Sequence, residues 1–339
     1  MKRPDFLHKG DTIAIVAPSF GVTTEPYKTK FEVALTKLRS RGYNVVTAPC
    51  CYKSDGLGIS TDPVTAAREL EEYYLDPSIQ ALFSAGGGEL MCETVGNIDF
   101  NKLKDAPPKW FMGYSDNTNF ILPLTTLCHT QSLYGICAPT LGQEWDRSLT
   151  DHMELLEGRI NKVSGYDKYE APDSPAENPL DQYNMTQPKI LTYFNHDRTA
   201  PLEVTGTLMG GCLDVLNNLA GTSLEDVRGF NQSTEDVIWI LESCDYNTMD
   251  IRRALWHLDK CEWFTKARAF IIGRPLAAFN QQYMGLDQYR AVTDILGKYR
   301  VPIIMDADVG HIDPIIPVIM GSTATIRSQD NEWSIEYLF

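Results

Sequence analysis

The tetrapeptide Gly113-Tyr114-Ser115-Asp116 stands where an apolar, strand-like segment ends and a helical pattern begins. A serine at such a turn projects out of the sheet, and the helix N-terminus favours negative charge beside it. The turn departs from the G-x-S-x-G pattern of many hydrolases at its last position, where Asn117 stands. Ser115 is therefore a candidate nucleophile, and the simpler interpretation is a serine that caps the following helix.

A serine nucleophile needs a base, a carboxylate that orients the base, and N–H donors for the developing oxyanion. Of the six histidines, only His311 lies in a loop after an apolar strand, where active sites gather in open α/β sheets. Glu242 ends the apolar segment 237–241, and Asp245 follows it closely. The order Ser, Glu, His is also found in a broad class of triad hydrolases. Each residue alone is more simply a cap, an ion-pair partner or a hydrogen-bonded loop side chain.

The segment Ala85-Gly86-Gly87-Gly88 follows another strand-like run. Consecutive glycines permit backbone torsions that turn N–H groups toward one anion, either a phosphate or an oxyanion. The segment lacks the Lys-Ser or Lys-Thr ending of a phosphate loop and the spacing of a dinucleotide fingerprint. A tight turn is the simplest interpretation.

One loop offers a different hydrolytic chemistry, because four potential metal ligands cluster in it: Asp306, Asp308, His311 and Asp313. Most acidic loops are simply solvated, so we expect no metal site. The eight cysteines include no C-x-x-C pair, and we interpret them as reduced thiols. We expect no cofactor.

The composition is that of a soluble globular protein of 339 residues, with 43% hydrophobic and 22% charged residues. A net charge of −15 and the absence of strongly basic stretches argue against nucleic acid as a partner. The apolar run 13–18 is far shorter than the roughly 20 residues of a membrane span. We therefore expect a cytoplasmic protein that does not bind a membrane.

Strand-like and helix-like segments alternate through the first half, which is typical of parallel strands joined by crossover helices. The expected strands are 13–16, 43–47, 81–83 and 110–112. Gly42 ends the first expected helix, Pro63 begins the second, and Pro123 obscures the start of the helix after Ser115.

The sequence predicts an α/β fold with two domains. A parallel-sheet domain with the nucleophile turn is expected over 1–160, and a C-terminal α/β or α+β domain over 201–339. The intervening residues 161–200 are rich in Pro, Asp, Asn and Tyr without clear period, as in a linker or wrapping connection. In the second domain we expect strands at 237–241, 269–272 and 302–305, and a helix containing Leu255 and Trp256.

Six landmarks carry a resemblance to a known family. In order along the chain they are Gly10 to Ser19, Ser84 to Gly88, Gly113 to Asp116, Gly210 to Leu213, Leu241-Glu242 and Gly310-His311. The chain resembles, over nearly its whole length, the LD-carboxypeptidase family, which includes the microcin C self-immunity proteins.

The resemblance implies an active site in a cleft between the two domains, without metal, in a homodimer. It implies a triad of Ser115, Glu242 and His311. It also implies that the backbone N–H groups of Gly87 and Asp116 are the oxyanion donors. Gly86 and Glu89 are the expected substrate contacts.

Typical members cleave the bond between a diamino acid and a terminal D-alanine in murein peptides, whereas the self-immunity branch hydrolyses an aminoacyl-nucleotide. Cys212 replaces the asparagine of the frequent Gly-Gly-Asn, and Glu89 follows the glycines, so both substrates stay open. We expect a serine hydrolase of the LD-carboxypeptidase type. The alternative of another class is a non-catalytic protein that binds an anionic ligand.

Overall fold

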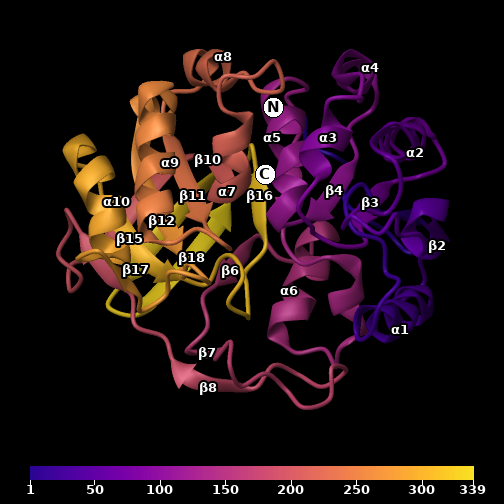
Figure 1. The fold of residues 1–339 in the computed structure, drawn as a ribbon, viewed down its shortest axis with the longest axis horizontal. Coiled ribbons are helices and arrows are strands. Elements are labelled where there is room, and N and C mark those ends of the chain that lie inside the picture. Colours follow the sequence, from indigo (N-terminus) through magenta and orange to yellow (C-terminus); the bar gives the residue numbers. More distant parts are fainter. The chain divides into compact units, whose positions relative to one another are not determined.

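The structure is a computed structural model that describes residues 1–339, and it divides the chain into two compact units. The first unit comprises Met1–Ile160, Ala176–Gln182 and Pro317–Ile319; the second comprises Asn161–Pro175, Tyr183–Ile316 and Met320–Phe339. Each unit combines helices with a sheet that contains parallel strands (Figure 1), which confirms the predicted α/β class.

The first unit is built on a six-stranded sheet. Its strands are β1 (Thr12–Val16), β2 (Asn44–Thr47), β3 (Ala81–Ser84), β4 (Trp110–Gly113), β5 (Ser132–Tyr134) and β16 (Val318–Met320). The spatial order is β16-β5-β4-β3-β1-β2. Strands β1 to β5 pair in parallel; the four predicted strands correspond to β1 to β4, and β5 was not predicted. The edge strand β16 comes from near the end of the chain and is not among the predicted strands.

Six helices belong to the first unit. They are α1 (Tyr27–Ser40), α2 (Pro63–Leu75), α3 (Met91–Val95), α4 (Phe100–Asp105), α5 (Thr118–Thr126) and α6 (Arg147–Leu156). Helix α2 begins at Pro63 as predicted, because the Asp62 side chain accepts a 2.9 Å hydrogen bond from the Thr65 N–H. Pro123 lies inside α5 rather than before it.

An eight-stranded sheet forms the centre of the second unit. Its strands are β6 (Lys162–Ser164), β9 (Thr192–Phe194), β10 (Leu202–Cys212), β11 (Val237–Glu242), β12 (Ala267–Gly273), β15 (Ile303–Ala307), β17 (Thr323–Gln329) and β18 (Glu332–Tyr337). The order is β6-β18-β17-β10-β11-β12-β15-β9, and β10, β11, β12 and β15 run in parallel. The three predicted strands are β11, β12 and β15; the parallel strand β10 and the antiparallel strands were not predicted.

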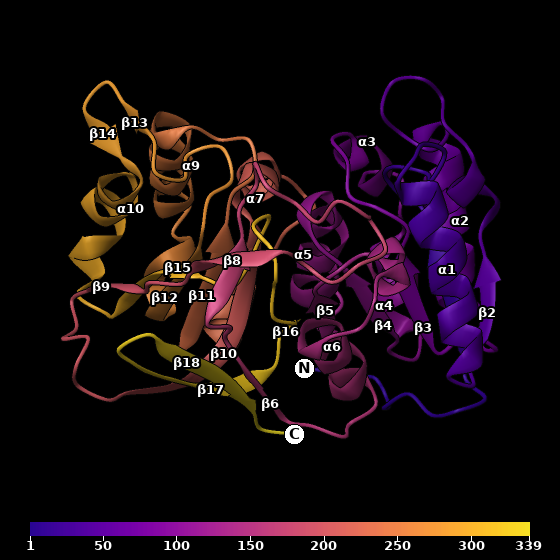
Figure 2. The ribbon, with the colours of Figure 1, turned by 90° about the horizontal axis from the view of Figure 1, so that it is seen from below.

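Four helices and two small hairpins complete the second unit. They are α7 (Leu213–Leu219), α8 (Val227–Ser233), α9 (Thr248–Lys260), α10 (Gln288–Leu296), β7 (Lys168–Glu170) with β8 (Met185–Pro188), and β13 (Gln282–Tyr283) with β14 (Leu286–Asp287). Helix α9, which contains Leu255 and Trp256 as predicted, contacts both α7 and α10 (Figure 2).

The segment 161–200, which the sequence suggests is a connection, contains the four short strands β6 to β9. None of the helices combines the length and the apolar character needed to cross a membrane. All eight cysteines are free thiols.

Candidate active site

Ser115 begins a single 3-10 turn, Ser115–Asn117, between β4 and α5. Its φ of 60° lies in the left-handed region, which residues other than glycine seldom adopt. The Ser115 N–H donates to the Tyr134 Oη at 3.1 Å. A strained residue directly after a parallel strand is the geometry of a nucleophile elbow, in which the side chain is lifted away from the sheet.

Asn117 joins this turn to the glycine-rich turn. Its Nδ2 donates to the Tyr114 carbonyl at 2.9 Å and to the Gly86 carbonyl at 3.0 Å. Gly113 leaves room for this side chain, because a Cβ there would lie 2.8 Å from the Asn117 Cγ. The residue that departs from the G-x-S-x-G pattern is thus the one that holds the two turns together.

Gly87 lies directly against the proposed nucleophile. A Cβ on Gly87 would be 3.2 Å from the Ser115 Cβ and 3.4 Å from its Oγ. The Gly87 carbonyl accepts a 3.0 Å hydrogen bond from the Phe20 N–H, which fastens the turn to the segment after β1. Glu89 is exposed two residues further along. The first unit therefore brings Gly87 and Ser115 together, with Gly86 and Asp116 beside them in the chain.

The Asp116 side chain is buried, with 2% of the residue exposed. Its Oδ2 accepts hydrogen bonds from the Ser19 Oγ at 2.5 Å and the Met91 N–H at 2.9 Å, and its Oδ1 accepts one from the Asn119 Nδ2 at 2.7 Å. Burial raises the pKa of Asp116 above its usual value, and these hydrogen bonds oppose the rise. Sequence reasoning considered only the backbone N–H of Asp116, because a partner as distant as Ser19 leaves no local pattern.

The second unit brings Glu242 and His311 together. Glu242 is the last residue of β11, and His311 follows β15 through a short loop. The His311 Nδ1 lies 2.8 Å from the Glu242 Oε2. The His311 side chain keeps 11% of its surface exposed, whereas the Glu242 side chain is fully buried. Both residues were chosen from the sequence because they follow strands, and in the structure the His311 imidazole contacts the Glu242 carboxylate.

Two glycines make room for this pair. A Cβ on Gly310, whose φ is 107°, would lie 2.6 Å from the Glu242 Oε2. A Cβ on Gly273 would lie 2.0 Å from the Val309 carbonyl oxygen and 3.1 Å from the Glu242 Cβ. Both glycines therefore let the backbone approach Glu242 more closely than any larger residue could.

The environment of His311 favours its charged form. Burial of the imidazole acts against that form, but the adjacent Glu242 carboxylate and the Cys244 thiol outweigh burial, so the pKa of His311 is raised well above its ordinary value. A general base must be neutral before it can accept a proton. The protonated His311 ring therefore has to lose its proton before it can act as a base.

The loop after β11 is fixed by Asp214. Its carboxylate accepts hydrogen bonds from three consecutive backbone N–H groups, those of residues 244–246, at 3.2, 2.9 and 3.1 Å. Asp245 belongs to this loop, and the carboxylate on the His311 Nδ1 is that of Glu242. Asp214 could not be singled out from the sequence, because nothing in its local pattern distinguishes it from any other residue in the first turn of a helix.

Cys212 borders Glu242 across the sheet. The two residues are register partners in the parallel pair β10 and β11, and Cys212 is buried. Its Sγ lies 3.6 Å from the Asp214 Oδ2. Burial raises the pKa of the Cys212 thiol, and the neighbouring carboxylates of Glu242 and Asp214 raise it further. Cys212 therefore remains an uncharged thiol beside the acid.

The acidic loop does not gather into a metal site. Asp308 pairs with Arg274, whose two terminal nitrogens each lie 3.0 Å from its Oδ1. Asp306 accepts hydrogen bonds from Gln288 and Tyr289 at 2.8 and 3.0 Å. No group of three or more His, Cys, Asp or Glu side chains is placed to hold a metal ion. The ligands that the sequence clusters in one loop thus have separate partners.

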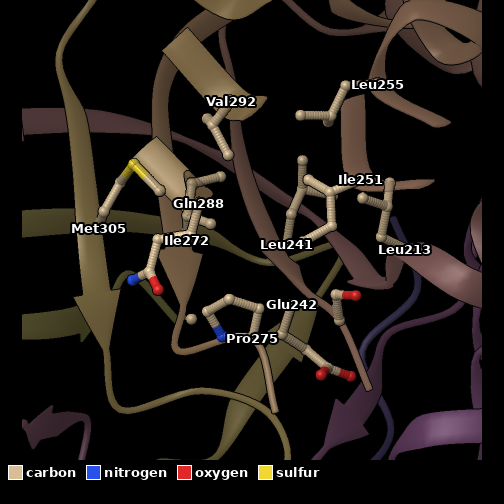
Figure 3. Close-up of a pocket in the computed structure, with 12 residues that line it drawn as sticks. Leu213, Leu241, Glu242, Ile251, Leu255, Ile272, Pro275, Gln288, Val292 and Met305 are labelled. Atoms are coloured by element: carbon tan, nitrogen blue, oxygen red, sulfur yellow. The ribbon is translucent and has the colours of Figure 1, made fainter. Parts of the chain in front are cut away.

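A small apolar cavity of about 20 Å³ lies behind Glu242. Leu213, Leu241 and Ile251 are among its lining residues, and the Glu242 carboxylate points away from Leu255 and Val292 (Figure 3). A space of this size holds about one water molecule. It therefore has no room for a substrate.

Protein-family models match the chain in two consecutive segments. The model described as the LD-carboxypeptidase N-terminal domain matches residues 13–135, and the model described as the LD-carboxypeptidase C-terminal domain matches residues 205–326. The first segment contains Ser115, and the second contains both Glu242 and His311.

Two curated relatives match along nearly their whole length. YocD of Bacillus subtilis (strain 168), provisionally named a carboxypeptidase, is 28% identical over 335 residues, which are 95% of each chain. A protein of the same strain named "Probable murein peptide carboxypeptidase" is 24% identical over 339 residues, which cover 98% of this chain and 94% of its own.

Solved structures show the same fold. An MccF-like protein from Bacillus anthracis str. Ames has a TM-score of 0.81 and 22% identity, with 100% of both chains covered. An MccF-like protein from Streptococcus pneumoniae in complex with AMP has a TM-score of 0.79 and 23% identity, with 97% of this chain and 99% of its own covered. The microcin C7 self immunity protein MccF in complex with aspartyl sulfamoyl adenosine has a TM-score of 0.79 and 20% identity, with 98% of both chains covered.

Proposed function

Because the chain belongs to the LD-carboxypeptidase family, we propose that it is a serine carboxypeptidase of murein peptides, in which Ser115, His311 and Glu242 form one triad. The observation that carries the proposal is the 2.8 Å contact between the His311 Nδ1 and the Glu242 Oε2. A carboxylate on Nδ1 orients the ring and stabilises its charged form, which is what a general base beside a serine requires. The left-handed turn at Ser115 supplies the matching nucleophile.

The proposed reaction is acyl transfer to Ser115 followed by hydrolysis. The Ser115 Oγ attacks the scissile carbonyl carbon while its proton passes to the His311 Nε2. The N–H groups of Gly87 and Asp116 donate to the resulting oxyanion. The intermediate then expels the amine, which takes the proton from His311. Water attacks the acyl-enzyme with His311 as base, which releases the carboxylic acid and restores the Ser115 hydroxyl.

Two kinds of relative suggest two substrates. The Bacillus subtilis relative named for murein peptides supports cleavage of a terminal D-amino acid from such a peptide. The MccF-like structure in complex with AMP and the MccF structure in complex with aspartyl sulfamoyl adenosine support an aminoacyl-nucleotide as the second candidate. We place the murein peptide first, because the relative named for it is more similar in sequence to this chain than the two nucleotide-bound structures are.

Substitution of the nucleophile tests the reaction. Ser115→Ala should lower turnover by at least about a thousandfold, because the triad acts as a unit. Mass spectrometry of the products from a murein tetrapeptide and from aspartyl sulfamoyl adenosine, incubated side by side, would identify the bond cleaved. Ser40→Ala, an exposed serine on α1, serves as the matched control and should retain full activity.

Covalent labelling distinguishes an enzyme from a binding protein. A serine-directed phosphonate should add to the wild-type chain and to Ser40→Ala, and should leave Ser115→Ala unmodified. Full turnover by Ser115→Ala would overturn the proposed mechanism. Tight binding of either compound without turnover or labelling would favour the non-catalytic alternative.

A further inference from the structure

The Asn117 side-chain amide contacts the peptide unit that contains one of the two proposed oxyanion donors. Its Nδ2 donates to the Gly86 carbonyl at 3.0 Å. That carbonyl and the Gly87 N–H belong to the same planar trans peptide, so they point in opposite directions. A donor that holds the Gly86 carbonyl therefore also fixes the direction of the Gly87 N–H.

The same Nδ2 also fixes the nucleophile turn. It donates to the Tyr114 carbonyl at 2.9 Å, and the backbone N–H of Asn117 donates to that carbonyl at 3.2 Å. The Tyr114 carbonyl shares its peptide plane with the Ser115 N–H, which donates to the Tyr134 Oη. One amide nitrogen thus sets two peptide planes, one in the glycine-rich turn and one in the nucleophile turn.

Packing keeps this amide in place. Asn117 has no exposed surface, and its Cγ faces Gly113, where a Cβ would approach to 2.8 Å. The orientation of the amide is determined by its partners, since only the nitrogen can donate to two carbonyl oxygens. Ser84 Oγ also donates to the Gly86 carbonyl, at 2.8 Å, but it belongs to the strand that leads into the same turn. Among these donors, only Asn117 joins the glycine-rich turn to the nucleophile turn.

We propose that Asn117 is a positioning residue that aims the Gly87 N–H at the oxyanion and keeps it in register with Ser115. The inference rests on the proposed serine mechanism and assigns the side chain a part in it. It also gives a physical reason for asparagine at the position where many hydrolases have the last glycine of G-x-S-x-G. A glycine there needs another group to orient the oxyanion donor.

The test compares an ester substrate with its thionoester, in which sulfur replaces the carbonyl oxygen. Sulfur accepts hydrogen bonds weakly, so the preference of an enzyme for the oxygen ester measures how well its oxyanion donors are placed. Asn117→Ala should lower kcat for the oxygen ester by about tenfold to a hundredfold, with little change in KM. The ratio of oxygen-ester to thionoester rates should fall with it.

Two further variants separate positioning from folding. Asn117→Leu fills a similar volume without a donor, and should show the same fall in the ratio if Asn117→Ala does not fold. Thr125→Val on α5 removes a buried hydroxyl that has no hydrogen-bond partner, and should leave the ratio unchanged. Loss of folded protein lowers both ester rates equally, so it cannot imitate the expected change in the ratio.

An unchanged ratio in folded Asn117→Ala or Asn117→Leu, beside an active wild type, would overturn the positioning role alone. A wild type that neither turns over the ester nor reacts with the phosphonate would instead overturn the serine mechanism itself. A lowered ratio in either Asn117 variant, with Thr125→Val unaffected, supports the inference.

Discussion

The His311 Nδ1 contacts the Glu242 Oε2 at 2.8 Å, although the two residues are 69 positions apart in the chain. Glu242 is the last residue of β11, and His311 lies in the loop after β15. Strand β12 lies between β11 and β15 in the sheet. A carboxylate and an imidazole that are both largely withdrawn from water interact strongly, because little solvent screens them. The Glu242 carboxylate should therefore govern the proton affinity of His311.

Glu242→Gln should shift the pH dependence of catalysis. The Glu242 charge helps to hold the pKa of His311 well above its ordinary value, so wild-type kcat/KM should rise with pH only above the usual histidine range of about 6.5. Without the charge the His311 pKa falls, and the acid limb should move to lower pH. The plateau should drop by about a hundredfold to ten-thousandfold.

The control for this profile is Asp245→Asn. The carboxylate on the imidazole is that of Glu242, so loss of the Asp245 charge should displace the acid limb much less. An acid limb at the same pH in Glu242→Gln and the wild type would show that the titrating group is not His311.

Gly310→Ala should disturb the same pair by steric means. The added Cβ would lie 2.6 Å from the Glu242 Oε2, at a φ of 107° that alanine rarely adopts. The variant should lose about 2 kcal/mol or more of unfolding free energy, and its acid limb should move in the same direction as that of Glu242→Gln. Gly297→Ala, where nothing lies within 4 Å of the new Cβ, should be close to wild type in both assays. Denaturant unfolding and a pH–rate profile that matched the wild type would contradict this prediction.

Ser115→Gly should be more stable than Ser115→Ala, although both should be inactive. The φ of 60° at Ser115 strains any residue that carries a Cβ, and glycine adopts it freely. The difference in unfolding free energy should be about 1 kcal/mol in favour of glycine. At Thr36, an exposed position within α1, the order should reverse, because glycine weakens a helix relative to alanine. Equal melting temperatures for the two Ser115 variants would argue against backbone strain at the nucleophile.

His152 should make stability depend on pH. Its Nε2 accepts a hydrogen bond from the Ile136 N–H at 3.2 Å, its Nδ1 lies 2.7 Å from the Ser148 carbonyl oxygen, and burial lowers its pKa to about 4. The unfolded chain binds this proton near pH 6.5 and the folded chain only near pH 4. The contribution of the neutral ring is therefore complete above about pH 6.5, and up to about 3 kcal/mol is lost as the pH falls to about 4.

Burial also raises the pKa of the neighbouring Asp151 to about 6, which makes stability fall as the pH rises. Comparison of the wild type with His152→Gln cancels this contribution and isolates that of His152. Glutamine stays neutral, so the advantage of the wild type over the variant should grow as the pH rises through this window. Parallel unfolding curves for the two proteins between about pH 4 and about pH 7 would contradict the assignment.

Local pattern in the sequence predicted most of the parallel strands of both units, though it missed β5 and β10. The buried runs that became β4 and β11 are continuous and apolar, and the cap at Asp62 with Pro63 marks a helix start by itself. Both signals act over a few neighbouring residues, so no knowledge of the remaining chain is needed to interpret them.

Such patterns could not predict contacts between residues that are far apart in the chain. The sequence pointed to Glu242 and His311 as strand-end residues, but it gave no sign that Gly310 makes room for their contact. Asn117 departs from the motif around Ser115, and only its hydrogen bonds to the Tyr114 and Gly86 carbonyls reveal what it holds. Side chains that connect distant turns follow no period, so no periodic signal could have marked them.

The position of β16 near the end of the chain determines when the first sheet can be completed during synthesis. The partner of β5 at the edge of the first sheet is β16 (Val318–Met320), which a ribosome adds only after β5 and most of the second unit. Until then the nascent first unit presents an unpaired edge, the feature that recruits foreign strands and leads to aggregation. A chain truncated after the first domain would keep that exposed edge permanently.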